Sequence, residues 1–109
     1  MTKRLEQLLT FLKTTPNEPF ILFAIAKEYE GMDDLENALS YYEKLTTDSP
    51  NYVGTYYHLG KLLEALQREK EAFFTYKKGM DIAKAQDDQH AFSELAGAKL
   101  DLGDDDDFE

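Results

Sequence analysis

Apolar side chains recur at steps of three and four residues along most of this chain, and that spacing places them on one stripe of an α-helix. Two neighbouring stretches, residues 20–30 and 35–45, each carry such a stripe. Its members are Leu22, Ile25, Ala26 and Tyr29 in the first stretch and Leu35, Ala38, Leu39, Tyr42 and Leu45 in the second. Pro50 ends the second stretch, because the residue before a proline is pushed out of helical geometry. The pattern predicts a hairpin of two antiparallel helices over residues 19–48, with a turn at 31–34.

Polar residues and a proline mark where these two helices begin. Pro19 fits the first turn of the first helix, where a backbone N–H is not needed. Asp34 is expected to be the N-cap of the second helix, because its carboxylate can accept a hydrogen bond from a free backbone N–H. Asp33 and Glu36 add negative charge near the positive end of that helix.

The same spacing returns 34 residues later and predicts a second hairpin over residues 52–85. The residues equivalent to the first stripes include Tyr56, Leu59, Gly60, Leu63, Ala72 and Tyr76. The identical positions of the two units are the pairs Lys27/Lys61, Glu30/Glu64, Ala38/Ala72, Tyr42/Tyr76 and Lys44/Lys78. Such a period, with one helical hairpin per unit, is typical of a stacked repeat array, and the alternative is an unrelated helical bundle with chance periodicity. Gly79 is expected to weaken the last helix of this hairpin by about 1 kcal/mol relative to alanine.

The segments on either side of the two hairpins extend the predicted array. Residues 2–15 are amphipathic and match the second helix of a hairpin, so they are interpreted as half a repeat. Residues 88–101 regain the apolar spacing once Asp87 and Asp88 are taken as an extra loop and cap. This last helix is expected to cover the second hairpin, because the end unit of an array otherwise exposes its apolar face.

The end of the chain differs from the repeats in composition. Gly103 stands where a helix would stop, and acids fill most of the positions after it. A run of like charges repels itself and usually stays solvated. The prediction is one helical domain of about six helices over residues 1–102, followed by a flexible acidic tail over 103–109.

The order of large and small residues in the two units resembles the tetratricopeptide repeat (TPR) family, whose pattern is a large residue, Leu-Gly, Tyr, then Ala with an aromatic residue four positions on, then Pro. The first unit meets it with Leu22, Ile25, Ala26, Tyr29, Ala38, Tyr42 and Pro50, and the second with Tyr56, Leu59, Gly60, Leu63, Ala72 and Tyr76. The chain departs from it chiefly at Leu22 and Tyr56, which stand for Trp, and at Lys84, which stands for the second Pro. The resemblance is to small TPR domains of the bacterial type. It implies an all-α superhelix, a short solenoid, with full repeats at 19–52 and 53–86.

Composition narrows the classes of partner. The net charge is −10, and six of the acids lie in residues 101–109, which leaves −4 for residues 1–100. Nucleic acid and anionic membranes are therefore not expected as partners, because binding to phosphates needs a positive face. The apolar run at 20–26 is far shorter than a membrane span, and the N-terminus lacks the cleavage site of a signal peptide. Because the chain also has no cysteine, we expect a cytoplasmic location.

The resemblance implies that the first helices of the hairpins line a concave groove that binds a peptide. The expected groove residues are Phe20, Phe23, Lys27 and Glu30 on the first hairpin and Tyr57, His58, Lys61 and Glu64 on the second. Stacked units would place Lys27 beside Lys61 and Phe23 beside Tyr57, a surface suited to a peptide with an apolar anchor and a carboxylate. The alternative is that the Lys and Glu residues form ordinary pairs on the helix surface.

Two further points bear on the ligand of this groove. The carboxylate-clamp members of the family use Asn and Arg beside their lysines, which this groove lacks, so their chaperone-tail ligand is not expected here. The tail sequence Asp-Asp-Asp-Asp-Phe-Glu is itself the kind of peptide that the groove should bind. It could occupy the groove of a second copy, whereas solvated disorder is the default for such a run.

The sequence carries no pattern of a catalytic or metal site. His58 and His90 lie far apart, without ligand spacing around them, and there is no Gly-rich phosphate loop or nucleophile motif. We therefore expect a protein-binding adaptor or scaffold without catalysis, cofactor or metal, monomeric or at most a weak homodimer. The alternative is a structural subunit that self-assembles through its outer face or its tail.

Overall fold

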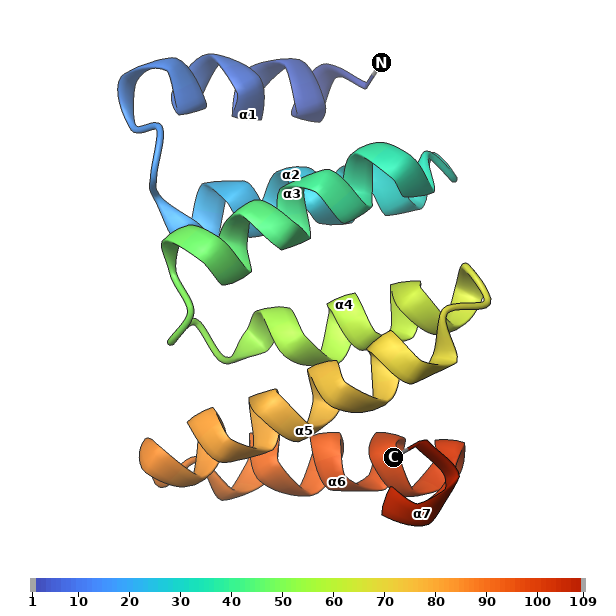
Figure 1. Ribbon diagram of the computed structural model, residues 1–109. Helices are drawn as coiled ribbons and strands as arrows, with labels where there is room; N and C mark the ends of the chain where they lie inside the picture. The colour runs from blue at the N-terminus through green and yellow to red at the C-terminus, as the bar shows by residue number, and fades with distance from the viewer. Residues whose placement is uncertain (1, 109) are drawn as a thin grey trace. The chain divides into compact units, whose positions relative to one another are not determined.

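A computed structural model describes residues 2–108, and over that range it contains seven helices and no strands (Figure 1). The helices are α1 (Lys3–Thr14), α2 (Pro19–Gly31), α3 (Leu35–Asp48), α4 (Gly54–Ala65), α5 (Glu69–Ala85), α6 (Gln89–Leu102) and α7 (Asp105–Phe108). The all-α fold predicted from the periodicity is confirmed, and a short α7 is added to the six expected helices. Contacts between residues divide the chain into two compact units, Met1–Tyr52 and Val53–Glu109.

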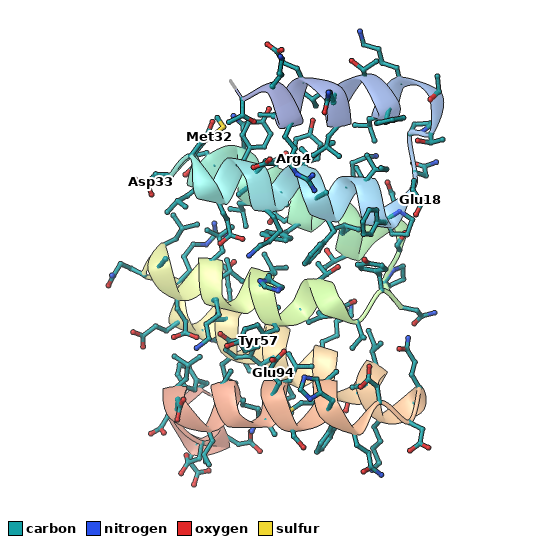
Figure 2. The ribbon with its side chains drawn as sticks, turned by 180° about the vertical axis from the view of Figure 1, so that it is seen from behind. Arg4, Glu18, Met32, Asp33, Tyr57 and Glu94 are labelled. Atoms are coloured by element: carbon teal, nitrogen blue, oxygen red, sulfur yellow. The ribbon has the colours of Figure 1, made fainter. Side chains whose placement is uncertain are left out.

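The first unit is built from α1, α2 and α3. Helices α2 and α3 form the predicted hairpin, and α1 packs against α2. Its buried apolar residues are Leu5, Leu8, Leu22, Ala24, Ile25, Ala26, Tyr29, Ala38, Leu39, Tyr42 and Leu45, which include every member of the predicted stripes except Leu35. At the edge of this core, Arg4 on α1 forms an ion pair with Glu28 on α2, with 3.1 Å between Nε and Oε1 (Arg4 is labelled in Figure 2). The amphipathic N-terminal segment therefore covers the α2 side of the hairpin.

The second unit is built from α4, α5 and α6. The hairpin of α4 and α5 is followed by α6, which packs against both of them. Its buried apolar residues are Tyr56, Leu59, Leu62, Leu63, Ala72, Phe73, Tyr76, Ala83, Leu95 and Ala98. Counting Asp87 and Asp88 as two extra loop residues makes Leu95 the equivalent of Leu59, and Leu95 is 1 % exposed. The predicted shift of register at the start of α6 is therefore confirmed.

Two glycines allow the helices of this unit to approach closely. A Cβ atom on Gly60 would lie 2.1 Å from the ring of Tyr76, and one on Gly79 would lie 2.5 Å from Cβ of Tyr56. Gly79 was expected only to weaken α5 through its low helix propensity. The packing supplies a reason for it, because the helix is buried at this position and leaves no room for a side chain.

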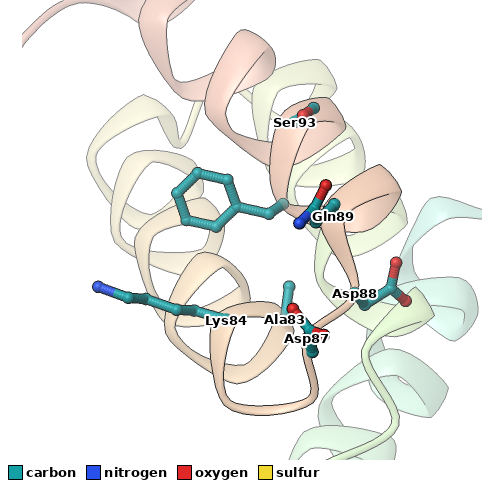
Figure 3. Close-up of a pocket in the computed structure, with 7 residues that line it drawn as sticks. Ala83, Lys84, Asp87, Asp88, Gln89 and Ser93 are labelled. Atoms are coloured by element: carbon teal, nitrogen blue, oxygen red, sulfur yellow. The ribbon is translucent and has the colours of Figure 1, made fainter.

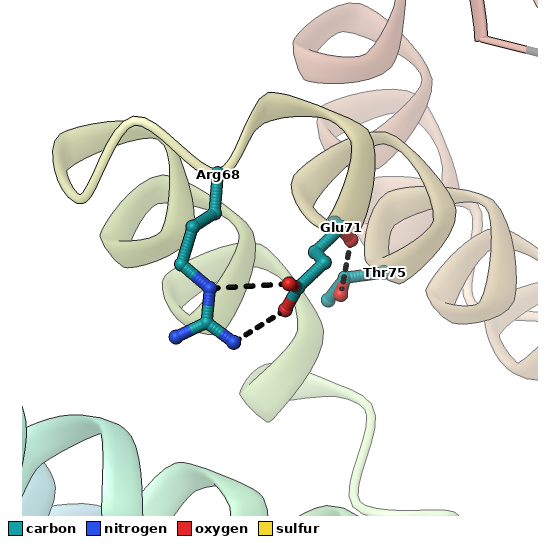
Figure 4. A network of polar contacts seen from close by, with 3 residues as sticks. All are labelled: Arg68, Glu71 and Thr75. Atoms are coloured by element: carbon teal, nitrogen blue, oxygen red, sulfur yellow. Dashed lines mark hydrogen bonds and ion pairs between the residues drawn. The ribbon is translucent and has the colours of Figure 1, made fainter.

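The predicted helix starts are confirmed in detail. Asp34 accepts a hydrogen bond from the backbone N–H of Asn37, Asp88 accepts one from Ala91, and Pro19 lies at the first turn of α2. Helix α5 begins differently, since Arg68 at its N-cap makes no capping bond. Instead the Arg68 guanidinium forms a bidentate ion pair with the Glu71 carboxylate. The backbone carbonyl of Glu71 accepts a hydrogen bond from the hydroxyl group of Thr75 (Figure 4).

The turns of the two hairpins and the turn between α5 and α6 share a conformation that the sequence pattern did not indicate. Asp33, Gln67 and Asp87 all have positive φ, at 59°, 64° and 56° (Asp33 is labelled in Figure 2). The N–H of the next residue then returns to a carbonyl five residues earlier, as from Asp34 to Tyr29 and from Arg68 to Leu63. Asp is among the residues that adopt this conformation most readily, whereas Gln does so without that preference.

Residues 103–109, predicted to be a flexible tail, contain α7 within their described part. Gly103 ends α6 as expected, with φ of 147°, a conformation that favours glycine. Composition alone does not indicate α7, which contacts residues of α5 and α6.

Candidate functional site

The eight predicted groove residues fall into two sets on two helices, and each set lies in a different unit. Helix α2 carries Phe20, Phe23, Lys27 and Glu30, and helix α4 carries Tyr57, His58, Lys61 and Glu64. The arrangement of both sets as a single groove stays a prediction from the sequence.

On α2, the four residues differ in how far they reach solvent. Phe20 is 60 % exposed, an unusual state for a large apolar ring, and Lys27 is exposed as well. Phe23 is half-buried, and its ring centroid lies 6.1 Å from that of Tyr42 and 5.9 Å from that of Tyr52. The face thus combines a free aromatic ring, a supported aromatic ring and an ammonium group.

On α4, the side chains contact one another more closely. The Tyr57 ring is half-buried, 5.6 Å from the His58 ring and 6.5 Å from that of Tyr76 (Tyr57 is labelled in Figure 2). The Lys61 ammonium lies 5.6 Å from the centroid of the Tyr57 ring, within the range of a cation–π contact. Its Nζ is also 3.7 Å from Oε2 of Glu64. The predicted alternative of a Lys–Glu surface pair is therefore found on α4, where an exposed pair contributes at most about 1 kcal/mol.

Glu30 and Glu64 have a role that the sequence pattern did not reveal. The hydroxyl group of the buried Tyr42 donates a hydrogen bond to the Glu30 carboxylate, and Tyr76 donates in the same way to Glu64. Burial, and then the hydrogen bond to the carboxylate, raise the pKa of Tyr42 and of Tyr76 well above the usual value for tyrosine. Each bond joins the last turn of a first helix to the middle of the second helix. The glutamates therefore hold the hairpins together, whatever else they contact.

The signal for this bond was present in the sequence as two identities at the 34-residue spacing, Glu30/Glu64 and Tyr42/Tyr76. The ring contacts repeat at the same spacing, since Phe23 on Tyr42 corresponds to Tyr57 on Tyr76. Each first helix thus presents an aromatic ring that is supported from beneath by a buried, hydrogen-bonded tyrosine. Such support limits the rotamers of the ring before any partner binds.

Two open hollows lie away from these residues. One, of about 350 Å³, is at the turn between α5 and α6 (Figure 3). It is lined by Ala83, Lys84, Asp87, Asp88, Gln89, Phe92 and Ser93. The other, of about 620 Å³, lies along α1 beside Lys3, Glu6, Gln7, Thr10 and Phe11. Neither contains a predicted site residue.

From residue 2 to residue 108, no helix has the length and apolar character needed to cross a membrane. In the same range, no three His, Asp or Glu side chains are grouped so that they could hold a metal ion.

Comparison with known sequences decides the family. The sequence model of the tetratricopeptide repeat matches residues 21–52 and 53–86, which together make up more than half of the chain. The chain belongs to the tetratricopeptide repeat family. No curated protein matches this TPR chain.

Solved TPR structures from bacteria support the assignment. The chain is 44 % identical to the crystal structure of a TPR domain protein from Salinibacter ruber, with 78 % of this chain and 94 % of that one covered and a TM-score of 0.75. A solution structure of a TPR domain protein from the same organism is 43 % identical, with coverages of 81 % and 89 % and a TM-score of 0.78. A protein from Bordetella parapertussis, 24 % identical, shares the fold over all of this chain and 95 % of its own, with a TM-score of 0.78. TPR domains commonly mediate protein–protein interaction and are generally non-catalytic.

Proposed function

We propose that this TPR protein is a non-catalytic adaptor that binds a peptide or helix of a partner protein through the exposed faces of α2 and α4. The observation that carries the proposal is the repetition, in each unit, of an aromatic ring supported by a buried tyrosine and followed one turn later by an exposed lysine. The concave groove predicted from the sequence would present both faces to one ligand. Cytoplasmic location and the exclusion of nucleic acid and membranes stay predictions.

The chemistry of the two faces favours a partner with an apolar side chain and a nearby carboxylate. Phe23 and Tyr57 offer ring faces whose positions are set by Tyr42 and Tyr76. Aromatic anchors in partly enclosed positions contribute most of the binding energy at many interfaces. Charges at the edge of an interface steer the approach of the partner and favour a partner of opposite charge. Lys27 and Lys61 would supply that positive edge, and Phe20 adds exposed apolar surface.

A peptide library provides a probe that does not require the natural partner. Random peptides displayed on phage are selected against the full chain, and the affinity of the best peptides is measured by fluorescence anisotropy. In the double variant Lys27→Glu/Lys61→Glu, we expect the affinity to fall about tenfold or more, because two like charges would then oppose the carboxylate of the peptide. Circular dichroism checks that the helices are unchanged.

The matched control is Lys44→Glu/Lys78→Glu. These lysines are also exposed and 34 residues apart, but they lie on the second helices, α3 and α5. The control should bind as the unchanged chain does. Equal affinity of all three proteins, or an equal loss in both variants, would reject the proposal.

Light scattering over a concentration series tests the alternative of a self-assembling subunit, whose average molecular mass would increase as its concentration rises.

A further inference from the structure

The last helix of the chain folds back onto the second unit. Figure 1 shows α7 beside the end of α6. Gly103 turns the chain, and the turn is closed by two local bonds: Asp107 accepts from the backbone N–H of Asp104, and Asp104 accepts from that of Asp106. The acidic segment therefore has a defined conformation over its described residues.

One ring of the tail covers a ring of the core. Phe108 stacks on Phe73, with 4.5 Å between the centroids and an angle of 23° between the planes. Phe73 belongs to α5 and is fully buried, and the ammonium group of Lys99 on α6 lies 4.8 Å from the centroid of its ring. The tail thus adds a second ring to a cluster in which α5 contributes the Phe73 ring and α6 contributes the Lys99 ammonium group.

A carboxylate accompanies this ring. Oδ1 of Asp105 lies 3.7 Å from Nζ of Lys77 on α5 and 3.7 Å from Nζ of Lys99 on α6. Asp105 and Phe108 are three residues apart, and that spacing places both side chains on one face of a helical turn. The face formed by Phe73, Lys77 and Lys99 therefore receives a ring and a carboxylate at a fixed separation.

This contact is weak enough to exchange. Asp105 is 52 % exposed and Lys77 41 %, and such ion pairs contribute between 0 and about 1 kcal/mol. A helix of four residues is not stable alone, so α7 depends on its contact with the face. The neighbouring acids repel one another and oppose the compact turn. The short connection to α6 raises the effective concentration of the tail at this face to about the millimolar range, which lets a weak contact hold it there.

We propose that Phe73, Lys77 and Lys99 form a second peptide site, which recognises a helical turn of the form Asp-x-x-Phe in a partner protein, and that the chain's own tail occupies this site as an intramolecular competitor. The site lies on α5 and α6 and shares no residue with the surface proposed above on α2 and α4. A partner that carries the same turn displaces α7, and its phenylalanine ring and carboxylate take the positions of Phe108 and Asp105. The tail therefore raises the concentration of partner that is needed for binding.

The test uses a labelled peptide with the sequence of residues 103–109 and the full chain carrying Phe108→Ala, which loses the stacking ring but keeps every core residue. Binding is followed by fluorescence anisotropy. We expect the variant to bind the peptide at least tenfold more tightly than the unchanged chain, in which α7 fills the site. A second peptide, with alanine in place of phenylalanine, should bind neither protein.

A charge reversal then locates the site. Adding Lys77→Glu to the Phe108→Ala chain should abolish binding of the peptide, whereas adding Lys84→Glu, the same change on the last turn of α5, should leave it intact. Amide hydrogen exchange gives an independent readout, since residues 104–108 should lose protection in Phe108→Ala and in the unchanged chain saturated with peptide.

Three results would overturn the proposal: equal binding by the unchanged and Phe108→Ala chains, equal binding of the two peptides, or an equal effect of Lys77→Glu and Lys84→Glu.

Discussion

Gly60 shows how a single hydrogen atom in place of a side chain controls the packing of a hairpin. The position faces the ring of Tyr76, which is fully buried and bonded to Glu64, so the ring has little freedom to move. The first unit has Ala26 at the equivalent position, which is also fully buried. The same fold therefore tolerates one methyl group here when the opposing tyrosine is placed to suit it.

Alanine at Gly60 should lower the free energy of unfolding by about 1–3 kcal/mol, because the added Cβ displaces a packed ring. The same substitution at Gly97 on α6, where an added Cβ meets nothing within 4 Å, should raise it by about 0.5–1 kcal/mol through helix propensity alone. Urea unfolding followed by circular dichroism measures both. Changes of the same sign would contradict the packing argument.

At the scale of the element, local polar residues decide where the helices start. Asp34 and Asp88 accept hydrogen bonds from N–H groups that the helix itself leaves unpaired. At α5, where Arg68 stands at the N-cap, the bond is missing and an Arg68–Glu71 ion pair is present instead. These features depend on three or four consecutive residues, and for that reason the caps at Asp34 and Asp88 could be predicted from the sequence.

Asp88→Ala should lower the free energy of unfolding by about 0.5–2 kcal/mol, because it leaves the N–H of Ala91 without its partner. Asp88→Ser keeps a side-chain oxygen at the same position and should retain most of the stability. Thermal unfolding of the two variants and the parent provides the comparison. If serine lost as much as alanine, the cap would not be the source of the effect.

At the scale of the whole molecule, each unit contains the same buried Tyr–Glu pair, so both units respond alike to alkaline pH. The pKa values of Tyr42 and Tyr76 are raised in the folded chain by burial and by the bond to Glu30 or Glu64. In the unfolded chain a tyrosine loses its proton near pH 10. Above that pH the unfolded state binds fewer protons than the folded state, and stability falls as the pH rises.

We therefore expect the contribution of these tyrosines to the free energy of unfolding to be constant below about pH 10 and to decline steadily above it. In the double variant Tyr42→Phe/Tyr76→Phe the decline should be shallower. Some slope should remain, because burial also raises the pKa of Tyr56. Urea midpoints between pH 8 and 11.5 measure the slope, and tyrosinate absorbance at each pH reports ionisation directly. Parallel curves for the parent and the variant would contradict the assignment.

The sequence by itself determined helices α1 to α6, the two hairpins, the shifted register of α6 and the caps at Asp34 and Asp88. These features follow from the spacing of apolar residues and from interactions within one or two turns, which the linear order of residues already contains. The same periodicity carried the resemblance to the TPR family, which the comparisons confirm. The eight surface residues on α2 and α4 were proposed on the same basis, and their joint role stays a prediction.

Only the tertiary structure decided which residues meet across helices. Glu30 and Tyr42 are 12 residues apart, and Phe73 and Phe108 are 35 apart, so their contact depends on the angle and separation of packed helices. No periodic pattern contains those quantities, because they arise from the fit of whole helix faces. For the same reason Gly79, a poor helix former in isolation, is required where α5 passes Tyr56. The acidic tail, which was expected to be solvated, contacts the Phe73 ring and the ammonium groups of Lys77 and Lys99.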